Sequence, residues 1–570
     1  MAALRLLGRQ RRQGARARDL LRGAHEMGPL GTKGRALATR LVLGVNVASG
    51  ELDRRIDAFV ARPSSLEPRV RDALRLAAFE ALYLDTPRQV CVSQGVELVR
   101  SVQPRAARLA NAVLRRIADC RGEVDEARRA VAGAAAGPGA RATDGEPVAV
   151  PGARTVAPGA SARATVAGAT SDTVAGACGN VAATPDGEPA ATEAELVLAS
   201  GYPAWLAARL VADLSMRGAA RACLCALDAA PIYVAAGPSA QASEAERRLA
   251  DAGFSPRQTA LPASWVLGEP AGLAASGLVG SCDVVVSDLA AQLVCRVAGV
   301  AQGRLLEVGQ GRGTKSLLLT ALARELSGEV GSVRVSGCEV AARKVAESAR
   351  RMAAAGVSEA VTCTSFDGTR LADEDVLPEE LAGAFDAVLV DAPCSGTGTM
   401  RRHPEIPWSL EAGVVAPLGG GSRAGAADGT ASCSEVPAKG PDVVMTVAGE
   451  GGTVASDGKS AAPRSWSLPA LQLALLSAAA ARVRAGGVLT YATCSVLRAE
   501  NEDVVAAFLA SEAGEGFVRA DVLEAPGILA LGEVGQELVR ACHSPLGDFR
   551  STPAPGLFDG HFCARLVRVR

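Results

Sequence analysis

The 570-residue sequence has few aromatic residues, few histidines and no long apolar run, and each shortage excludes a class of protein. Aromatic side chains make up only 3% of the chain, so its hydrophobic core is smaller than the length suggests. The absence of a run of about 18 apolar residues excludes a membrane span. Four histidines and no paired Cys-x-x-Cys segments predict that the chain holds no metal.

An excess of charge of either sign is also missing. The chain has 60 basic and 61 acidic residues, so its net charge does not require a polyanionic partner. Residues 1–40 are the exception, with ten Arg or Lys and two acidic residues, but they lack the apolar segment of a secretory signal. The 14 cysteines are too scattered for a disulfide framework. We therefore expect a reducing compartment, the cytoplasm.

Two low-complexity stretches divide the chain. From Ala118 to Glu195 there is no Leu, Ile, Met or aromatic residue, so this stretch cannot bury enough apolar surface to offset its ordering entropy. Residues 411–466 are similarly rich in Gly, Ala and Ser. The predicted organisation is a helical domain (1–120), a disordered linker (121–195), a mixed region (196–300) and an α/β domain (301–570) that contains the second stretch as a disordered insertion.

The periodicity of apolar residues separates the helical domain from the α/β domain. Apolar residues recur at spacings of three and four before residue 120, which predicts helices. After residue 301, short apolar runs alternate with amphipathic segments, which predicts a parallel, doubly wound sheet. The predicted strands are Arg304–Val308, Ser332–Cys338, Ala387–Val390 and Val488–Thr493, and the predicted helices are Lys315–Leu326, Ala342–Ala355 and Leu471–Val483.

A glycine-rich loop follows the first predicted strand of the α/β domain. Its sequence is Glu307-Val308-Gly309-Gln310-Gly311-Arg312-Gly313-Thr314-Lys315. Such loops occur in dinucleotide-binding folds and in folds that bind S-adenosylmethionine (SAM), and a purely structural turn is the alternative. Glu339 ends the next strand, where a carboxylate can accept ribose hydroxyls, and Asp367 ends a third strand, where it can take an adenine amino group. Together these residues predict a bound adenosine.

Two cysteines each follow an apolar strand of the predicted sheet. Cys394 lies in Asp391-Ala392-Pro393-Cys394-Ser395-Gly396-Thr397-Gly398, and Cys494 lies in Tyr491-Ala492-Thr493-Cys494-Ser495. A thiolate that adds to carbon 6 of a cytosine makes carbon 5 nucleophilic, and a base must later remove the carbon-5 proton. Methylation of an exocyclic nitrogen needs no cysteine, and a cysteine hydrolase needs a paired histidine, which no motif around His403, His543 or His561 supports. The pattern favours carbon-5 methylation of a pyrimidine.

With these motifs, the chain resembles the RsmB/Sun (Fmu) family of ribosomal RNA cytosine-5 methyltransferases. The resemblance extends to the residues after the two cysteines, Arg401-Arg402-His403-Pro404-Glu405 with Trp408, and Glu500-Asn501-Glu502. It also includes a helix at Ser287–Gln292 and a closing hairpin at Phe558–Phe562. The resemblance implies an all-α, NusB-like RNA-binding domain and a Rossmann-like class I SAM-dependent methyltransferase domain with a small α/β RNA-binding extension. It further implies a monomer that acts on RNA, with small-subunit rRNA favoured, without a membrane or metal partner.

The resemblance also implies roles for single residues. Cys494 would be the nucleophile, Cys394 would assist release as the base or through it, and Asp391 would bond the target cytosine or the cofactor. Arg401 and Arg402 suit phosphate contacts, with a solvated pair as the alternative. The residues implied to hold SAM are Glu307, Gly309, Gln310, Gly311, Arg312, Gly313, Thr314, Lys315, Glu339, Asp367 and Asp391, although Lys315 has the alternative of a solvated lysine at a helix start.

Two segments depart from the family pattern. The family's loop usually reads as a cysteine followed by AAPGGKT, whereas this chain has Arg312 in place of the proline, where it can crowd the site. The segment expected to read PLTLRVN is PIYVAAG at 231–237, without the arginine and asparagine that organise the RNA-binding extension. These departures leave two alternatives, a non-catalytic RNA-binding or ribosome-assembly protein with a degenerate cofactor loop, and the same chemistry on tRNA. Only the NusB-like domain favours rRNA over tRNA as the substrate, and it does so by analogy with the family.

Overall fold

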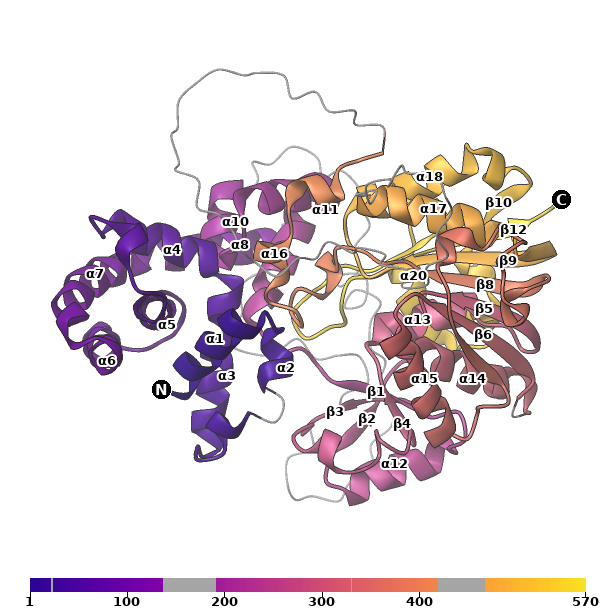
Figure 1. Ribbon diagram of the computed structural model, residues 1–570, viewed down its shortest axis with the longest axis horizontal. Coiled ribbons are helices and arrows are strands. Elements are labelled where there is room, and N and C mark those ends of the chain that lie inside the picture. The colour runs from indigo at the N-terminus through magenta and orange to yellow at the C-terminus, as the bar shows by residue number, and fades with distance from the viewer. Residues whose placement is uncertain (22–23, 137–190, 330, 419–466) are drawn as a thin grey trace, which may run out of the picture. The chain divides into compact units, whose positions relative to one another are not determined.

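The computed structural model consists of two compact units (Figure 1). The residues it describes are 1–21, 24–136, 191–329, 331–418 and 467–570. The first unit comprises residues 1–124, 201–203 and 403–471, and the second comprises residues 125–200, 204–402 and 472–570. Most of the two predicted low-complexity stretches, including the insertion at 411–466, lies outside the described residues.

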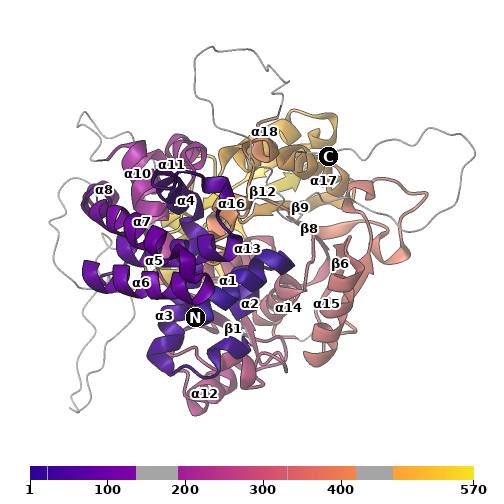
Figure 2. The ribbon, with the colours of Figure 1, turned by 60° about the vertical axis from the view of Figure 1, so that its left-hand side comes forward.

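The first unit is built from helices. They are α1 (Ala2–Gln13), α2 (Ala17–Leu21), α3 (Thr32–Val47), α4 (Ser49–Ala58), α5 (Pro68–Tyr83), α6 (Arg88–Val102), α7 (Ala107–Asp119) and the short α16 (Ile406–Ser409). Helix α7 buries Val113, Leu114 and Ile117, the spacing of one helix face. Helices α5, α6 and α7 lie side by side in both ribbon views (Figure 2). The predicted all-α N-terminal domain is confirmed.

One helix lies within the stretch 121–195 that the sequence predicts to be disordered, and a second begins at its end. Helix α8 covers Arg121–Ala136, and helix α10 covers Glu193–Ser200. Helix α8 buries Val124 and Val131 completely, and its many alanines have the highest helix propensity of any residue. The predicted disorder is therefore wrong for residues 121–136 and 193–195. It rested on the lack of large apolar side chains, and alanines with a few valines are enough to form and bury helix α8. Residues 137–190 lie outside the described part of the chain.

A small antiparallel sheet precedes the main sheet of the second unit. Its order is β2-β3-β1-β4, with β1 (Tyr233–Ala236), β2 (Pro256–Gln258), β3 (Ser264–Leu267) and β4 (Val284–Val286). Helix α12 (Ala242–Asp251) packs on this sheet, and α11 (Ala204–Leu224) precedes it in the chain beside α10. Trp265 and Val234 are fully buried in the core of this sheet. Gly237 directly follows β1, and a Cβ there would overlap the carbonyl of Cys282. An asparagine, as in the family pattern, would not fit at position 237 on this local backbone.

The main sheet has the order β10-β12-β9-β8-β5-β6-β7. Its strands, with their connecting helices, are β5 (Gly303–Val308), α14 (Thr314–Ser327), β6 (Val333–Glu339), α15 (Ala342–Ala354), β7 (Val361–Ser365), β8 (Phe385–Asp391), α17 (Leu468–Ala480), β9 (Val483–Thr493), β10 (Phe517–Ala520) and β12 (Phe562–Arg568). Figure 1 shows β12, β9, β8, β5 and β6 side by side. The predicted strands and helices of the α/β domain are all present.

The four strands predicted from the sequence, which are β5, β6, β8 and β9, are parallel neighbours, so the predicted parallel sheet is confirmed for them. The complete sheet is mixed. Strand β12 runs antiparallel to both β9 and β10. Phe562, at the start of β12, pairs with Thr493, at the end of β9, so β12 begins at the edge where the parallel strands end. Strand β10 precedes β12 in the chain and pairs with its other side. The region between them contains α18 (Glu502–Leu509), α19 (Pro526–Leu529), α20 (Glu533–Ala541) and the short β11 (Phe549–Arg550).

The apolar core lies against this sheet, and the shared direction of its parallel strands determines which edge receives their carboxyl ends. Helix α13 (Leu289–Ala298) starts at Asp288, whose side chain accepts the backbone N–H of Ala290, and its apolar residues pack with Leu305 and Leu389 of the sheet. Strands β5, β6, β8 and β9 are parallel, so their carboxyl ends meet at one edge. No helix in the described ranges is long and apolar enough to cross a bilayer.

Candidate active site

The two cysteines of the sequence motifs face each other at the carboxyl edge of the sheet. Cys394 follows β8, Cys494 directly follows β9, and these strands are parallel neighbours. The Sγ atoms lie 3.1 Å apart, within hydrogen-bond distance for sulfur. Both residues are half-buried. The expected delivery of two thiols to one edge thus produces a direct sulfur–sulfur contact.

The environment of the pair distinguishes the two thiols. The hydrogen bond with Cys494, together with burial and the nearby charge of Glu500, raises the pKa of the Cys394 thiol well above its usual value. Cys394 therefore keeps its proton at neutral pH and can donate it to the Cys494 sulfur. A thiolate at Cys494 is the nucleophilic form of a cysteine.

The buried carboxylate of Glu500 connects the two cysteine loops. Its Oε1 accepts the backbone N–H of Ser395 at 2.8 Å and the side-chain amide of Gln472 at 3.0 Å. Its Oε2 accepts the hydroxyls of Ser395 at 2.5 Å and Ser495 at 2.6 Å. Because these serines directly follow Cys394 and Cys494, one side chain fixes both loops. The sequence motifs predicted no role for Glu500, although the repeated Cys-Ser pair was a signal that both loops share a polar partner.

Arg401 and Arg402 do not face solvent. The Arg401 guanidinium is completely buried and donates to Asp559 at 3.0 Å. Arg402 pairs with Asp288 at 2.7 Å and also with Asp559. Both expectations, phosphate contacts and a solvated pair, are therefore wrong. Buried arginines need carboxylate partners, and these two attach the loop after β8 to the segment before β12.

The glycine-rich loop curls around the end of β5. Gly309, Gly311 and Gly313 have φ angles of 83°, 58° and 72°, in the region that favours glycine. A Cβ at position 309 would also overlap the carbonyl of Asp391. The Glu339 carboxylate, at the end of β6, accepts the backbone N–H groups of Gly311 and Ala341 at 3.0 Å each. Its oxygens keep further acceptor capacity, as the hydroxyls of a ribose require.

Lys315 forms an ion pair at the end of β8, the strand that precedes Cys394. Its Nζ donates to Oδ2 of Asp391 at 2.6 Å. Burial alone would lower the pKa of Lys315, but the charge of Asp391 outweighs it, and the pKa lies above its usual value. The alternative of a solvated lysine is therefore wrong. Asp367 follows β7 and accepts the backbone N–H and the hydroxyl of Thr369, so it caps a short turn at the same edge.

Glu307 and Gln310 support the loop from below. Both are buried; Ser316 donates its hydroxyl to Glu307, and the Gln310 amide donates to the Ser316 hydroxyl at 3.0 Å. Burial raises the pKa of Glu307 to about 8. The hydroxyl of Thr314 accepts a hydrogen bond from Arg351. The structure thus places these side chains behind the loop.

Arg312 does not crowd the site. Its guanidinium is exposed and pairs with Glu347 of α15 at 3.2 Å. The three glycines of the loop and the Glu339 carboxylate together fit an adenosine-containing cofactor such as SAM. Within the ranges that the structure describes, no three His, Cys, Asp or Glu side chains are grouped to hold a metal ion.

Comparisons with known proteins agree with this architecture. Residues 2–119 match the NusB family, and residues 298–418 and 465–567 match the family described as 16S rRNA methyltransferase RsmB/F. The chain is 29% identical over 194 residues to ribosomal RNA small subunit methyltransferase B of Serratia proteamaculans, an alignment that covers 34% of this chain and 29% of the relative. It is 29% identical over 254 residues to putative methyltransferase MT1451 of Mycobacterium tuberculosis, covering 44% of this chain and 41% of the relative.

A solved structure extends the comparison of the fold. The crystal structure of PH0851 superposes with a TM-score of 0.58 at 17% identity, over 96% of this chain and 93% of that one. At this identity the match shows a shared fold. The aligned parts of the two relatives above amount to less than half of their own length.

Proposed function

Because the chain belongs to the RsmB/F family of 16S rRNA methyltransferases and carries a NusB-family domain, we propose that it methylates carbon 5 of a cytosine in RNA, with 16S rRNA as the substrate. SAM is the proposed methyl donor, and Cys494 is the proposed nucleophile of a covalent Cys–cytosine intermediate. The observation that carries the proposal is the 3.1 Å contact between Cys394 and Cys494. Transfer of a methyl group to a nitrogen or oxygen would require neither thiol.

The residues proposed to hold SAM surround the carboxyl ends of β5 and β6. Gly309, Gly311 and Gly313 would contact its methionine part, Glu339 its ribose and Asp367 its adenine. Lys315 and Asp391 lie between this region and the cysteines, where their ion pair orients the Asp391 carboxylate. When bound, SAM supplies an electrophilic methyl group.

The two cysteines would act in sequence. The Cys494 thiolate forms a bond to carbon 6 of the cytosine, and the electron pair of the 5,6 double bond moves toward carbon 5, which takes the methyl group. A base then removes the carbon-5 proton. The electrons of that C–H bond restore the double bond, and the Cys494–carbon bond breaks with return of the thiolate.

The pKa of Cys394 would change during this cycle. In the free protein, its hydrogen bond with Cys494 is the largest cause of its raised pKa, and the charge of Cys494 adds to it. Once Cys494 is bonded to carbon 6, it is a neutral thioether and both causes are removed. Cys394 then loses its proton to solvent more easily, so a larger fraction of it is the thiolate, the form that can accept the carbon-5 proton.

Methyl transfer from tritiated SAM to in vitro transcribed, unmodified 16S rRNA tests the proposal. We expect label at a cytosine that bisulfite sequencing then identifies as carbon-5 methylated, and no label with Cys494→Ala. Label in tRNA alone would contradict the proposed substrate. A chain that binds RNA but neither binds SAM nor transfers label would support the non-catalytic alternative.

A further inference from the structure

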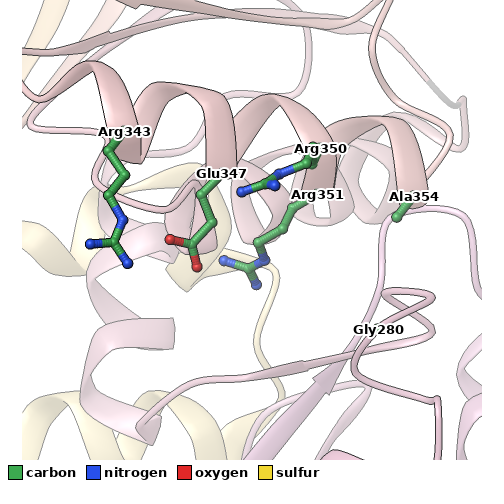
Figure 3. A pocket seen from close by; sticks show the side chains of 6 residues that line it. All are labelled: Gly280, Arg343, Glu347, Arg350, Arg351 and Ala354. Carbon is green, nitrogen blue, oxygen red and sulfur yellow. The ribbon is translucent and has the colours of Figure 1, made fainter. Parts of the chain in front are cut away.

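A polar hollow lies beside helix α15 (Figure 3). Arg343, Glu347, Arg350 and Arg351 of α15 line it, and Gly280, from the segment before β4, forms the facing wall. Figure 3 shows Arg343, Glu347 and Arg351 extending from α15 toward the space between the helix and that segment. The hollow therefore joins the methyltransferase sheet to the small antiparallel sheet.

Positive charge in this region is not balanced by acidic groups. Helix α15 carries four basic residues and one acidic residue, Glu347. That carboxylate is already paired with Arg312 of the glycine-rich loop. Among the described residues, neither Arg343 nor Arg350 forms an ion pair or a hydrogen bond, and both are exposed. The chain as a whole has a net charge of −1, so this local excess is not a general property of its surface.

Arg351 connects the hollow to the cofactor loop. Its Nη1 donates to the carbonyl of Arg312 at 2.7 Å and to the Thr314 hydroxyl at 2.8 Å. The guanidinium is thus committed to holding the loop at the start of α14. An anion bound in the hollow would therefore lie next to Arg351, the arginine that holds the cofactor loop.

We propose that the arginine cluster Arg312, Arg343, Arg350 and Arg351 binds the phosphate backbone of the RNA substrate. This inference rests on the proposed function only in taking RNA as the substrate. Guanidinium groups present paired N–H donors that match phosphate oxygens, and clustered like charges are stabilised when an anion neutralises them. No aromatic side chain lines the hollow, so it offers no surface on which a base could stack. The cluster therefore positions the backbone of the RNA and does not read its sequence.

The test uses Arg343→Ala/Arg350→Ala in the full chain, because these two side chains hold no other part of the structure. The matched control is Arg247→Ala/Arg484→Ala, which removes the same charge from two exposed arginines of the same unit. Binding of in vitro transcribed 16S rRNA is measured by filter binding at several KCl concentrations. Calorimetry with SAM checks that the cofactor loop is intact in each variant.

We expect the Arg343/Arg350 variant to bind RNA about tenfold or more weakly at about 0.1 M salt, with a salt slope shallower by about 1.5. The control variant should stay within about twofold of wild type, and SAM binding should be unchanged in both. Equal losses in the two variants, or no loss in either, would overturn the inference. Binding of poly-glutamate is measured in parallel. If the Arg343/Arg350 variant lost poly-glutamate binding but still bound RNA, the inference would also be overturned, because the cluster would then bind an acidic protein segment.

Failure of this inference is distinguishable from failure of the proposed function. The binding assay needs no methyl transfer, so a protein that binds RNA through Arg343 and Arg350 but methylates no cytosine would contradict only the proposed function. A protein that methylates 16S rRNA and binds it equally well without these arginines would contradict only the role of the cluster.

Discussion

The sulfur atoms of Cys394 and Cys494 lie 3.1 Å apart, although one hundred positions separate the two residues in the chain. Two adjacent parallel strands produce this contact, since each delivers its cysteine just beyond its carboxyl end. The contact with Cys494 is the largest cause of the raised pKa of Cys394, so the proton on Cys394 depends on its partner.

Removal of Cys494 should make Cys394 more acidic. In Cys494→Ala, the hydrogen bond and the charge that contribute to the raised pKa of Cys394 disappear, while burial and Glu500 remain. We expect the alkylation of Cys394 by iodoacetamide, followed by mass spectrometry across pH, to shift to lower pH in the variant. An unchanged profile would show that Cys494 does not control the proton on Cys394.

Glu500→Gln should impair catalysis without weakening cofactor binding. The amide cannot accept all four hydrogen bonds that the carboxylate accepts, and each unsatisfied buried group costs about 1–3 kcal/mol. We expect kcat to fall at least about tenfold, because both cysteine loops are released, and the Kd for SAM to stay within about twofold. The variant should also have a more acidic Cys394 thiol, since the charge of Glu500 raises its pKa.

Glu502→Gln is the matched control for Glu500→Gln. Glu502 is mostly buried and pairs with Arg550 at 3.1 Å, but it contacts neither cysteine loop. Two results together would contradict this role: a similar loss of kcat in both variants, and an unchanged alkylation profile of Cys394 in Glu500→Gln. Glu500 would then contribute only to the general stability of the fold.

Two substitutions in the glycine-rich loop should have opposite consequences for SAM binding. In Gly309→Ala, the new Cβ would overlap the Asp391 carbonyl, and the φ of 83° is unfavourable for alanine, so we expect loss of measurable binding. In Arg312→Ala, only an exposed ion pair with Glu347 is removed, and the affinity should stay within about threefold. Isothermal titration with SAM measures both. A stronger effect at 312 than at 309 would contradict the placement of the loop.

Glu307 should make the folded state less stable as pH rises. Its folded pKa of about 8 lies above its usual value of 4.5, so the stability gained from its protonated form is complete below about pH 4.5 and is lost as pH rises toward 8. Glu307→Gln mimics the protonated carboxyl at every pH. We therefore expect the variant to gain stability relative to wild type between pH 5 and pH 8.5, by a few kcal/mol at about 1.4 kcal/mol per pKa unit. Urea unfolding at several pH values measures this; a difference independent of pH would contradict the raised pKa.

The sequence predicted the centre of the fold better than its periphery. Strands β5, β6, β8 and β9 have apolar runs that end in polar or glycine-rich segments, and these signals fixed both their direction and the edge where the site lies. Strand β12 pairs with β9 from 69 or more residues away, and no local pattern indicates whether such a strand runs parallel or antiparallel. Helix α8 was missed because small alanines and two valines suffice when a partner surface is available.

In the candidate site, too, part of the arrangement could be predicted from the sequence and part could not. The positions of Cys394, Cys494, Glu339 and the loop glycines followed from their places after strands. The arrangement of charged side chains did not, because Arg401 is buried against Asp559 and Arg312 turns toward Glu347, and both pairings join distant parts of the chain. Sequence alone could not distinguish an arginine that faces RNA from one that pairs with a buried aspartate.

Trapping with RNA that contains 5-fluorocytosine tests the central claim most directly. Fluorine at carbon 5 cannot leave as a proton does, so with SAM present the wild-type protein should form a covalent adduct with the RNA that survives denaturing electrophoresis. The account predicts no adduct with Cys494→Ala and a persistent adduct on ordinary RNA with Cys394→Ala. An adduct formed by Cys494→Ala, or rapid turnover by Cys394→Ala, would contradict it.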